Sequence, residues 1–320
     1  MADSGFQARV AAITELTGEI RCLALERVDG APLPAFTPGA HIDLHLGVGL
    51  VRQYSLCNGP DVHAQYLVAV KREPQSRGGS EAVHRLEVGA TLHVSGPRNH
   101  FPLAASADEH LLLAGGIGVT PLLSMARHLR ADGKPFRLEY FTRGPQHAAF
   151  AEELEGPGWR RHVVLRYGME TQLLQAHLEA LLDATAPSTH VYICGPAPFM
   201  QLAIEIASRS RPREAVHYEY FAADPDAQAG PRTSFLVRCA KSGRDLEVAE
   251  GESIVDVLVR NGIRVEVMCE QGVCGTCLTG VLEGRPDHRD AFLTDEERAA
   301  GDRMLVCCSR SYDPVLVLDL

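Results

Sequence analysis

The chain has 320 residues, enough for two or three units of about 100–150 residues each. Hydrophobic residues make up 45% and charged residues 22%, which excludes disordered, fibrous and membrane-embedded proteins. The formal net charge of −10 argues against a nucleic-acid-binding protein, which would carry a basic surface. The N-terminal segment has no basic start followed by a long apolar run. We therefore expect neither a signal peptide nor a membrane span, and a cytoplasmic protein.

The cysteine content and the uneven charge give further constraints. Nine cysteines in a cytoplasmic chain of this size indicate metal or redox chemistry rather than disulfides. Residues 233–320 hold 10 basic and 16 acidic side chains, whereas residues 1–232 hold 21 and 25. The C-terminal part is thus the more acidic per residue. This predicts a partner with a basic docking patch, although surface charge also serves solubility alone.

Residues 6 to about 103 consist of short β-rich runs separated by glycine and proline clusters, which is typical of an antiparallel barrel. One short helix is expected over residues 80–86. The expected strands include residues 8–13, 41–46, 52–56, 65–71 and 91–94.

From His110 onward, apolar strands alternate with amphipathic helices. HLLLAGG is followed by TPLLSMARHLRA, then by FRLEYFT, and later HVYICGP is followed by APFMQLAIEIASR. This alternation predicts an α/β domain with a parallel sheet and crossover helices. The segment AADPDAQAGPR that comes next has no apolar period, so we interpret it as an interdomain linker.

The remaining sequence predicts short strands around one helix over residues 253–261, together with a cysteine-rich loop. Thr294 and Glu297 form a capping-box pattern for a second short helix that ends near Gly301. The chain is thus expected to be multidomain. The expected divisions are a barrel domain over 1–104, an α/β domain over 105–223, a linker over 224–232 and an α+β domain over 233–320.

Four cysteines carry the strongest signal. Cys269, Cys274 and Cys277 follow the spacing C-x4-C-x2-C, and 29 residues separate Cys277 from Cys307. This is the spacing of plant-type [2Fe–2S] ferredoxins, in which four thiolates hold two irons. The alternative is a structural zinc site. Zinc sites, however, usually combine a C-x2-C pair with a second pair or with histidines, and only one such pair occurs here.

Small residues surround these cysteines. Gly272, Gly275 and Thr276 let the backbone wrap closely and direct N–H groups at the sulfurs. Cys308 is an alternative to Cys307 as the fourth ligand, because adjacent cysteines cannot easily bind one iron together. The isolated Cys22, Cys57, Cys194 and Cys239 are expected to line the core or a site.

Two further segments are candidates for binding a flavin. In the strand Arg52-Gln53-Tyr54-Ser55-Leu56, alternation puts Arg52 and Tyr54 on one face and Ser55 on the other. The segment 77–80, RGGS, precedes a helix and offers backbone N–H groups and a hydroxyl to a phosphate. Taken alone, the first segment is also typical of any edge strand, and the second is also typical of an ordinary capped helix.

The segment GGIGVTP at residues 115–121 follows an apolar strand and opens a helix. We expect Thr120 to be the N-cap and Pro121 the first helical residue. The pattern differs from the G-x-G-x-x-G fingerprint of dinucleotide-binding folds. Arg143, after the next strand, leaves the choice between NADH and NADPH open, because an arginine there could meet a 2′-phosphate.

Together these segments resemble the phthalate dioxygenase reductase family, a branch of the ferredoxin–NADP reductase superfamily, over essentially the whole chain and in the same domain order. The resemblance implies a flavin barrel, a nucleotide domain and a β-grasp ferredoxin domain. It implies that Arg52, Tyr54, Ser55, Val68, Ala69, Lys71, Gly79 and Ser80 bind flavin, and that Gly116, Gly118, Thr120, Gly195 and Pro196 bind nicotinamide nucleotide. Ser55, Cys194 and Phe221 would act at the reacting rings, although Phe221 is equally a core aromatic. Cys307, at the end of a strand, matches the fourth cluster ligand of the family.

The same resemblance implies FMN, NADH and a [2Fe–2S] cluster as cofactors of an electron-transfer reductase. Nicotinamide gives up an electron pair and the cluster accepts single electrons, so a flavin is needed between them. The implied partner is a terminal oxygenase of the Rieske type or an O-demethylase, and we expect a monomer. The alternatives are a reductase for a cytochrome P450 and a redox-sensing binding protein.

Overall fold

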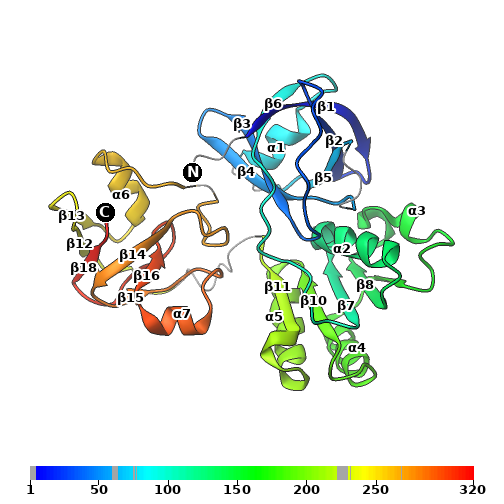
Figure 1. Cartoon of the computed structure of the whole chain (residues 1–320). Coiled ribbons are helices and arrows are strands. Elements are labelled where there is room, and N and C mark those ends of the chain that lie inside the picture. Colours follow the sequence, from blue (N-terminus) through cyan, green and yellow to red (C-terminus); the bar gives the residue numbers. More distant parts are fainter. Residues whose placement is uncertain are drawn as a thin grey trace. The chain divides into compact units, whose positions relative to one another are not determined.

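The computed structural model describes residues 5–59, 64–74, 76, 78–221, 230, 232–267 and 269–320. They form two compact units that divide between Phe221 and Ala222. The first unit holds a six-stranded antiparallel sheet and a five-stranded parallel sheet, and the second holds a mixed sheet (Figure 1). Of the expected linker, only Gly230 and Arg232 lie within the described residues. The domain boundaries that the sequence predicts, at residues 104, 223 and 232, stay predictions.

The antiparallel sheet runs in the order β4-β3-β6-β1-β2-β5. Leu56, directly after β4, pairs with Val68 of β5, and this pairing closes the sheet into a barrel. Alternate side chains such as Ile42 and Leu44 are fully buried in its interior. The barrel contains β1 (Phe6–Glu15), β2 (Ile20–Arg27), β3 (His41–Gly47), β4 (Leu50–Ser55), β5 (Tyr66–Lys71), α1 (Gly79–His84) and β6 (Thr91–Val94).

The parallel sheet runs in the order β11-β10-β7-β8-β9. Leu112 of β7 packs toward α2, whereas its neighbour Leu111 packs toward α4 and α5, so helices cover both faces. Its elements are β7 (His110–Gly115), η1 (Gly116–Gly118), α2 (Val119–Ala131), β8 (Phe136–Thr142), η2 (Pro145–His147), α3 (Ala151–Leu154), β9 (Val163–Tyr167), α4 (Thr171–Asp183), β10 (His190–Cys194), α5 (Ala197–Ser210), η3 (Arg213–Ala215) and β11 (Val216–Glu219).

The barrel and the parallel sheet share one core in the first unit. Cys22 and Cys57 of the barrel belong to the same buried cluster as Leu122 of α2. Two side chains of α2 bind barrel carbonyls: Ser124 Oγ donates to Asn58 O at 2.8 Å and Arg127 Nη1 donates to Cys57 O at 2.7 Å. These bonds fix the end of β4 relative to α2, since residues 57 and 58 directly follow β4.

Two sequence expectations for the start of α2 are wrong. Thr120 is not the N-cap of α2, because the turn η1 leads directly into the helix, which begins at Val119 with Gly118 as N-cap. The Thr120 hydroxyl instead donates back to Ile117 O at 3.0 Å and is buried. Pro121 is the third residue of the helix and not the expected first, but it still lies in the first turn, where its missing N–H leaves no bond unmade.

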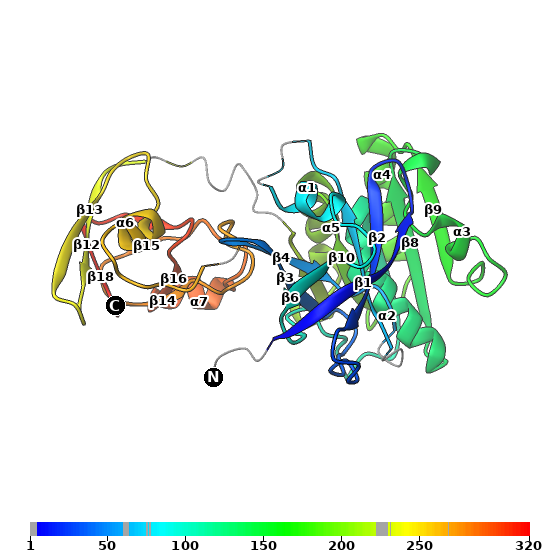
Figure 2. The same cartoon turned by 90° about the horizontal axis from the view of Figure 1, so that it is seen from above.

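In the second unit the sheet runs in the order β13-β12-β18-β14-β16, with α6 packed against it (Figure 2). Ser253 is the N-cap of α6 and Thr294 is the N-cap of α7, and each forms a capping box with the residue three positions later. The capping box of α7 was expected from the sequence. The elements are β12 (Phe235–Cys239), β13 (Arg244–Val248), α6 (Ile254–Arg260), β14 (Leu278–Glu283), β15 (Pro286–Asp287), α7 (Asp295–Ala300), β16 (Arg303–Leu305), β17 (Arg310–Ser311) and β18 (Val315–Leu318).

Across the described parts of the chain, no helix has both the length and the apolar character needed to cross a membrane.

Candidate functional site

The four cysteines of the expected cluster site lie together in the second unit. Cys269 interacts with Cys274 and Cys307, and Cys277 interacts with Cys307. All four are buried. Among the described residues, no three His, Cys, Asp or Glu side chains are arranged around a single metal ion. The spacing of the four cysteines along the chain is that of plant-type [2Fe–2S] ferredoxins, in which two thiolates bind each iron.

The loop around the cysteines is shaped for close approach of its backbone. Gly272 and Gly275 have φ of 70° and 74°, in the left-handed region that favours glycine. A Cβ at Gly272 would lie 2.5 Å from Cys308 Sγ, and one at Gly275 would lie 2.3 Å from the Phe292 ring. A side chain at either position would therefore have to displace Cys308 or Phe292. The expectation that small residues close this loop is confirmed.

Hydrogen bonds converge on the first cysteine. Gln271 N–H donates to Cys269 Sγ at 3.3 Å. The neighbouring thiols, Cys274 first, and the N–H groups of Val273 and Gln271 lower the pKa of Cys269. Donors to sulfur stabilise the thiolate form, which is the form that binds iron. The Cys269 environment is therefore suited to a metal ligand.

The geometry favours Cys307 over Cys308 as the fourth ligand. Cys307 interacts with Cys269 and Cys277, and also with Cys308. The Sγ of Cys308 instead lies 3.8 Å from Leu305 O and 3.8 Å from the Ser309 hydroxyl. Cys307 is thus the one of the two that joins the other three thiols.

In the first unit, the structure brings Arg52 of β4 to the start of α1. A Cβ on Gly79 would lie 2.6 Å from Arg52 Cγ, so the arginine side chain lies directly across this glycine. Ser80 Oγ accepts from Glu73 N–H at 3.1 Å and donates to Ser76 Oγ at 3.0 Å. A guanidinium beside the first backbone N–H groups of α1 fits the phosphate of a flavin nucleotide. Arg77 lies outside the described residues.

The other expected flavin residues divide between two environments. Tyr54 packs against the barrel core, and burial raises its pKa to about 12, so the phenol is neutral. Ser55 lies opposite His41 of β3 and is buried. In β5, Val68 is fully buried in the barrel, whereas Ala69 belongs to the core shared with the parallel sheet. Lys71 pairs with Glu73 at 2.9 Å.

The expected nucleotide loops meet at the carboxyl edge of the parallel sheet. A Cβ on Gly118 would lie 2.3 Å from Cys194 O, and one on Gly195 would lie 3.0 Å from Gly115 Cα. These two glycines therefore let the loops after β7 and β10 touch each other. Gly116, in contrast, has nothing within 4 Å of its Cβ position, so a cofactor can approach it. Pro196 is the N-cap residue of α5.

A buried carboxyl group at this edge escaped the sequence analysis. Glu219 ends β11 and is the strand partner of Cys194. Its Oε2 is buried without a hydrogen-bond partner among the described residues, and burial raises its pKa to about 8. Burial also raises the pKa of Cys194 well above the usual value. The sequence feature that could have revealed Glu219 is its place inside the β-rich run VHYEYF. Alternate residues of a strand face opposite sides, so one face of this run is expected to be buried.

Phe221 is the last described residue of the first unit. Its side chain is 37% exposed, so it is not the core aromatic that the sequence left as an alternative. Ser55, Cys194 and Phe221 thus come from three places: the end of β4, the end of β10 and the residues after β11. Their approach to one flavin ring stays a proposal.

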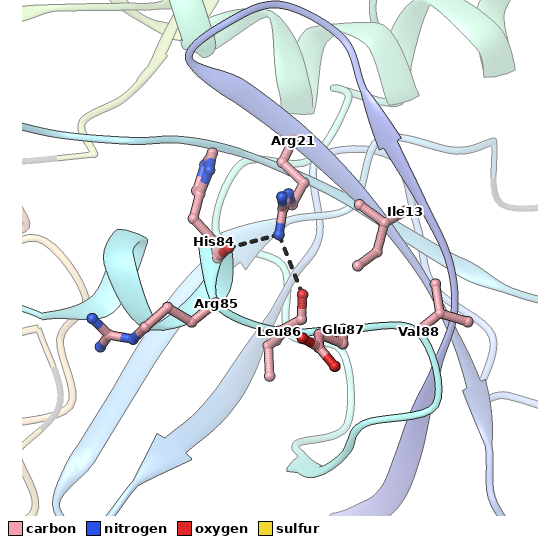
Figure 3. A pocket seen from close by; sticks show the side chains of 7 residues that line it. All are labelled: Ile13, Arg21, His84, Arg85, Leu86, Glu87 and Val88. Carbon is pink, nitrogen blue, oxygen red and sulfur yellow. Dashed lines mark hydrogen bonds between the residues drawn. The ribbon is translucent and has the colours of Figure 1, made fainter.

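A separate pocket of about 660 Å³ opens on the barrel (Figure 3). Arg21 crosses it and donates to His84 O at 2.7 Å and Leu86 O at 3.2 Å, at the C-terminal end of α1. Its guanidinium also pairs with Glu15 at 2.7 Å. A cation that binds the last carbonyls stabilises a helix end. We therefore assign this pocket a structural role.

Two family models match the chain. The oxidoreductase NAD-binding domain covers residues 112–205, which span the strands β7 to β10 of the parallel sheet. The 2Fe-2S iron-sulfur cluster binding domain covers residues 237–311, which contain all four proposed ligands.

Whole-chain relatives extend these matches. A vanillate O-demethylase oxidoreductase from Pseudomonas sp. is 44% identical over 315 residues, with 97% of this chain and 98% of the relative covered. The phthalate dioxygenase reductase of Burkholderia cepacia is 38% identical, with 99% and 98% covered. The chain belongs to the phthalate dioxygenase reductase family. The resemblance seen in the sequence is thereby confirmed.

Solved structures agree with this family. A phthalate dioxygenase reductase, described as a modular structure for electron transfer from pyridine nucleotides to [2Fe-2S], superposes with a TM-score of 0.77 and covers 99% of this chain and 98% of its own. The three-part fold and the assignment as an oxidoreductase are confirmed.

Proposed function

We propose that this chain is the reductase component of a Rieske-type oxygenase or O-demethylase system. It takes electrons from NADH through FMN to its [2Fe–2S] cluster and delivers them to a terminal oxygenase. The observation that carries the proposal is the four-cysteine cage in the same chain as an NAD-binding sheet and a barrel with the Arg52–Gly79 contact. Relatives with this whole arrangement are named as reductases of oxygenase systems.

Each group of residues has a proposed role. Arg52, Gly79 and Ser80 hold the flavin phosphate, and the segment that contains Tyr54, Ser55, Val68, Ala69 and Lys71 borders its ring. The loops with Gly116, Gly118, Thr120, Gly195 and Pro196 hold the dinucleotide. Cys269, Cys274, Cys277 and Cys307 are the iron ligands.

FMN, when bound, accepts electrons in pairs and passes them on singly. The protein's own contribution is to position the rings and to exclude water. We propose that Ser55 and Cys194 border the reacting rings from opposite sides and that Phe221 covers the flavin where nicotinamide enters. Burial raises the pKa of Glu219 to about 8, so its carboxyl group carries a proton at pH 7.

The holoprotein itself provides the test. We expect one FMN, identified by the mass of the released flavin, together with two irons and two sulfides per chain. NADH should drive reduction of ferricyanide and of cytochrome c. A colourless protein that contains zinc in place of iron and sulfide would exclude the proposal.

A second acceptor is favoured by one comparison. An intact type IV self-sufficient cytochrome P450 monooxygenase is 35% identical over the matched part, superposes with a TM-score of 0.81 and covers 99% of this chain. That chain is longer, and this protein matches 41% of it. Rates of electron delivery to a purified Rieske oxygenase and to a purified P450 distinguish the two acceptors, and we expect the Rieske oxygenase to be reduced faster.

A monomeric state, a cytoplasmic location and a basic docking patch on the partner stay predictions.

A further inference from the structure

The choice between NADH and NADPH can be traced to a loop at the ligand edge of the parallel sheet. Arg143 directly follows β8, the second strand of the domain. In sheets of this kind, ligands bind beyond the carboxyl ends of the strands, and the residue after the second strand is placed to meet the ribose 2′ position. Arg143 is 72% exposed, so its guanidinium is accessible to a phosphate.

A carboxylate from the barrel already engages this arginine. Glu19 lies in the turn between β1 and β2, and its Oε2 is 3.6 Å from Arg143 Nη2 and 3.5 Å from His147 Nδ1. The turn holds Glu19 in place: Glu19 N–H donates to Thr17 Oγ1 at 3.2 Å, and Arg72 N–H donates to Glu19 O at 2.7 Å. One acidic residue of the barrel thus contacts two basic side chains beside the expected dinucleotide site.

These contacts contribute little to stability. The Glu19 side chain is 45% exposed, and ion pairs between such exposed groups add little to the stability of a protein. Arg143 can therefore readily leave Glu19 for another anionic group. A dinucleotide with a 2′-phosphate brings about two more negative charges than NADH. Glu19 would repel those charges and would also compete for Arg143, whereas NADH has only a hydroxyl at this position.

We propose that Glu19 is a positioning residue that sets the selectivity for NADH by occupying Arg143. This inference rests on the proposed function, since it concerns the same dinucleotide site. It assigns the selectivity to the barrel, which approaches the nucleotide loop through its β1–β2 turn. No residue of the glycine loops needs to distinguish the two dinucleotides.

The test compares Glu19→Gln with Glu26→Gln in the full holoprotein. Both changes remove one negative charge from the barrel. Glu26 lies in β2, seven residues after Glu19, and a strand extends by about 3.3 Å per residue, so Glu26 is distant from Arg143. It pairs with Arg9 instead. The ratio of kcat/KM for NADPH to that for NADH, with ferricyanide as acceptor, should rise about fivefold in Glu19→Gln at low salt. It should stay at the wild-type value in Glu26→Gln, and the rise should shrink in 0.5 M salt.

Direct binding of NAD⁺ and NADP⁺, measured by calorimetry, should show the same change in relative affinity. Arg143→Gln should lower the NADPH:NADH ratio, and adding Glu19→Gln to it should raise the ratio by clearly less than Glu19→Gln does in the wild type, because only the direct repulsion remains. An unchanged ratio in Glu19→Gln, an equal rise in Glu26→Gln, or a full rise in the Arg143→Gln background would each overturn the inference. If the wild type oxidises neither dinucleotide, the proposed function itself fails, and that result is distinct from these.

Discussion

At the scale of single residues, the carboxyl edge of the parallel sheet shows how closely two loops approach. The position of a Cβ on Gly118 lies 2.3 Å from the carbonyl oxygen of Cys194, a distance that no side chain tolerates. Neither backbone can move freely, because β7 and β10 are paired strands in the centre of the sheet. The glycine is required by packing of the protein against itself, before any cofactor is considered.

Gly118→Ala should therefore destabilise the protein by about 1–3 kcal/mol, the usual cost of forcing an extra group into a packed site. Urea denaturation followed by circular dichroism measures the change. Gly18→Ala is the matched control, because nothing lies within 4 Å of its Cβ position. Equal stability of the two variants would show that the loops separate at no cost.

Glu219 gives a pH-dependent prediction. Its pKa in the folded protein, about 8, is above the ordinary value of 4.5 because of burial. The folded state therefore retains a proton that the unfolded state releases, so its stabilising effect is complete below pH 4.5 and is lost as the pH rises through 8. Between pH 5 and 9 the free energy of unfolding of the wild type should fall by about 4 kcal/mol more than that of Glu219→Gln.

Denaturation curves at several pH values test this expectation. Glu214→Gln, an exposed residue of η3, is the control and should follow the wild type. Parallel pH profiles for the wild type and Glu219→Gln would contradict the buried, protonated carboxyl group.

At the scale of secondary-structure elements, local chemistry fixes the helix ends of the second unit. Ser253 Oγ accepts from Asp256 N–H at 3.1 Å, and the Asp256 carboxylate accepts from Ser253 N–H at 3.3 Å. These two hydrogen bonds satisfy two backbone N–H groups, those of Ser253 and Asp256, at the start of α6. The helix is only seven residues long, so its first turn contributes much of its stability.

Ser253→Ala should lower the free energy of unfolding by about 1 kcal/mol, since the alanine side chain cannot accept a hydrogen bond. Ser234→Ala, at an exposed position of the same unit, is the control and should have little effect. Thermal unfolding of the two variants provides the comparison. A loss in Ser234→Ala as large as that in Ser253→Ala would mean that the capping box is not its cause.

Elements with a strong local signal were predictable from the sequence, and those fixed by tertiary contacts were not. The capping pattern of Thr294 and Glu297 gave the start of α7, and Gly301, with φ of 65°, gave its end. Strand β2 (Ile20–Arg27), IRCLALER, was not among the predicted runs. It is rich in helix-forming residues and is held as a strand by pairing with β1 and β5.

The candidate site divides in the same way. The cysteine spacing predicted the ligand cage, because four thiolates at these intervals have few other uses. The contact of Arg52 with Gly79 and the pairing of Glu19 with Arg143 join residues 27 and 124 positions apart. Such contacts depend on how the barrel folds and packs, which no local pattern encodes.

At the scale of the whole molecule, the chain combines two kinds of site that are useful only together. The first unit contains the proposed dinucleotide edge and the proposed flavin strand, and Arg127 and Ser124 of α2 bind the carbonyls that follow this strand. The second unit offers a buried cage of four thiols. NADH supplies electrons in pairs and a [2Fe–2S] cluster carries them singly, so both units are required for the proposed electron transfer.

Separating the two sites by one substitution tests this account most directly. In Cys269→Ser, which removes one ligand of the cage, NADH-driven reduction of cytochrome c should be abolished, because that reaction depends on the cluster. Reduction of ferricyanide, which takes electrons from the flavin, should remain largely intact. An equal loss of both activities would contradict an order in which the flavin precedes the cluster.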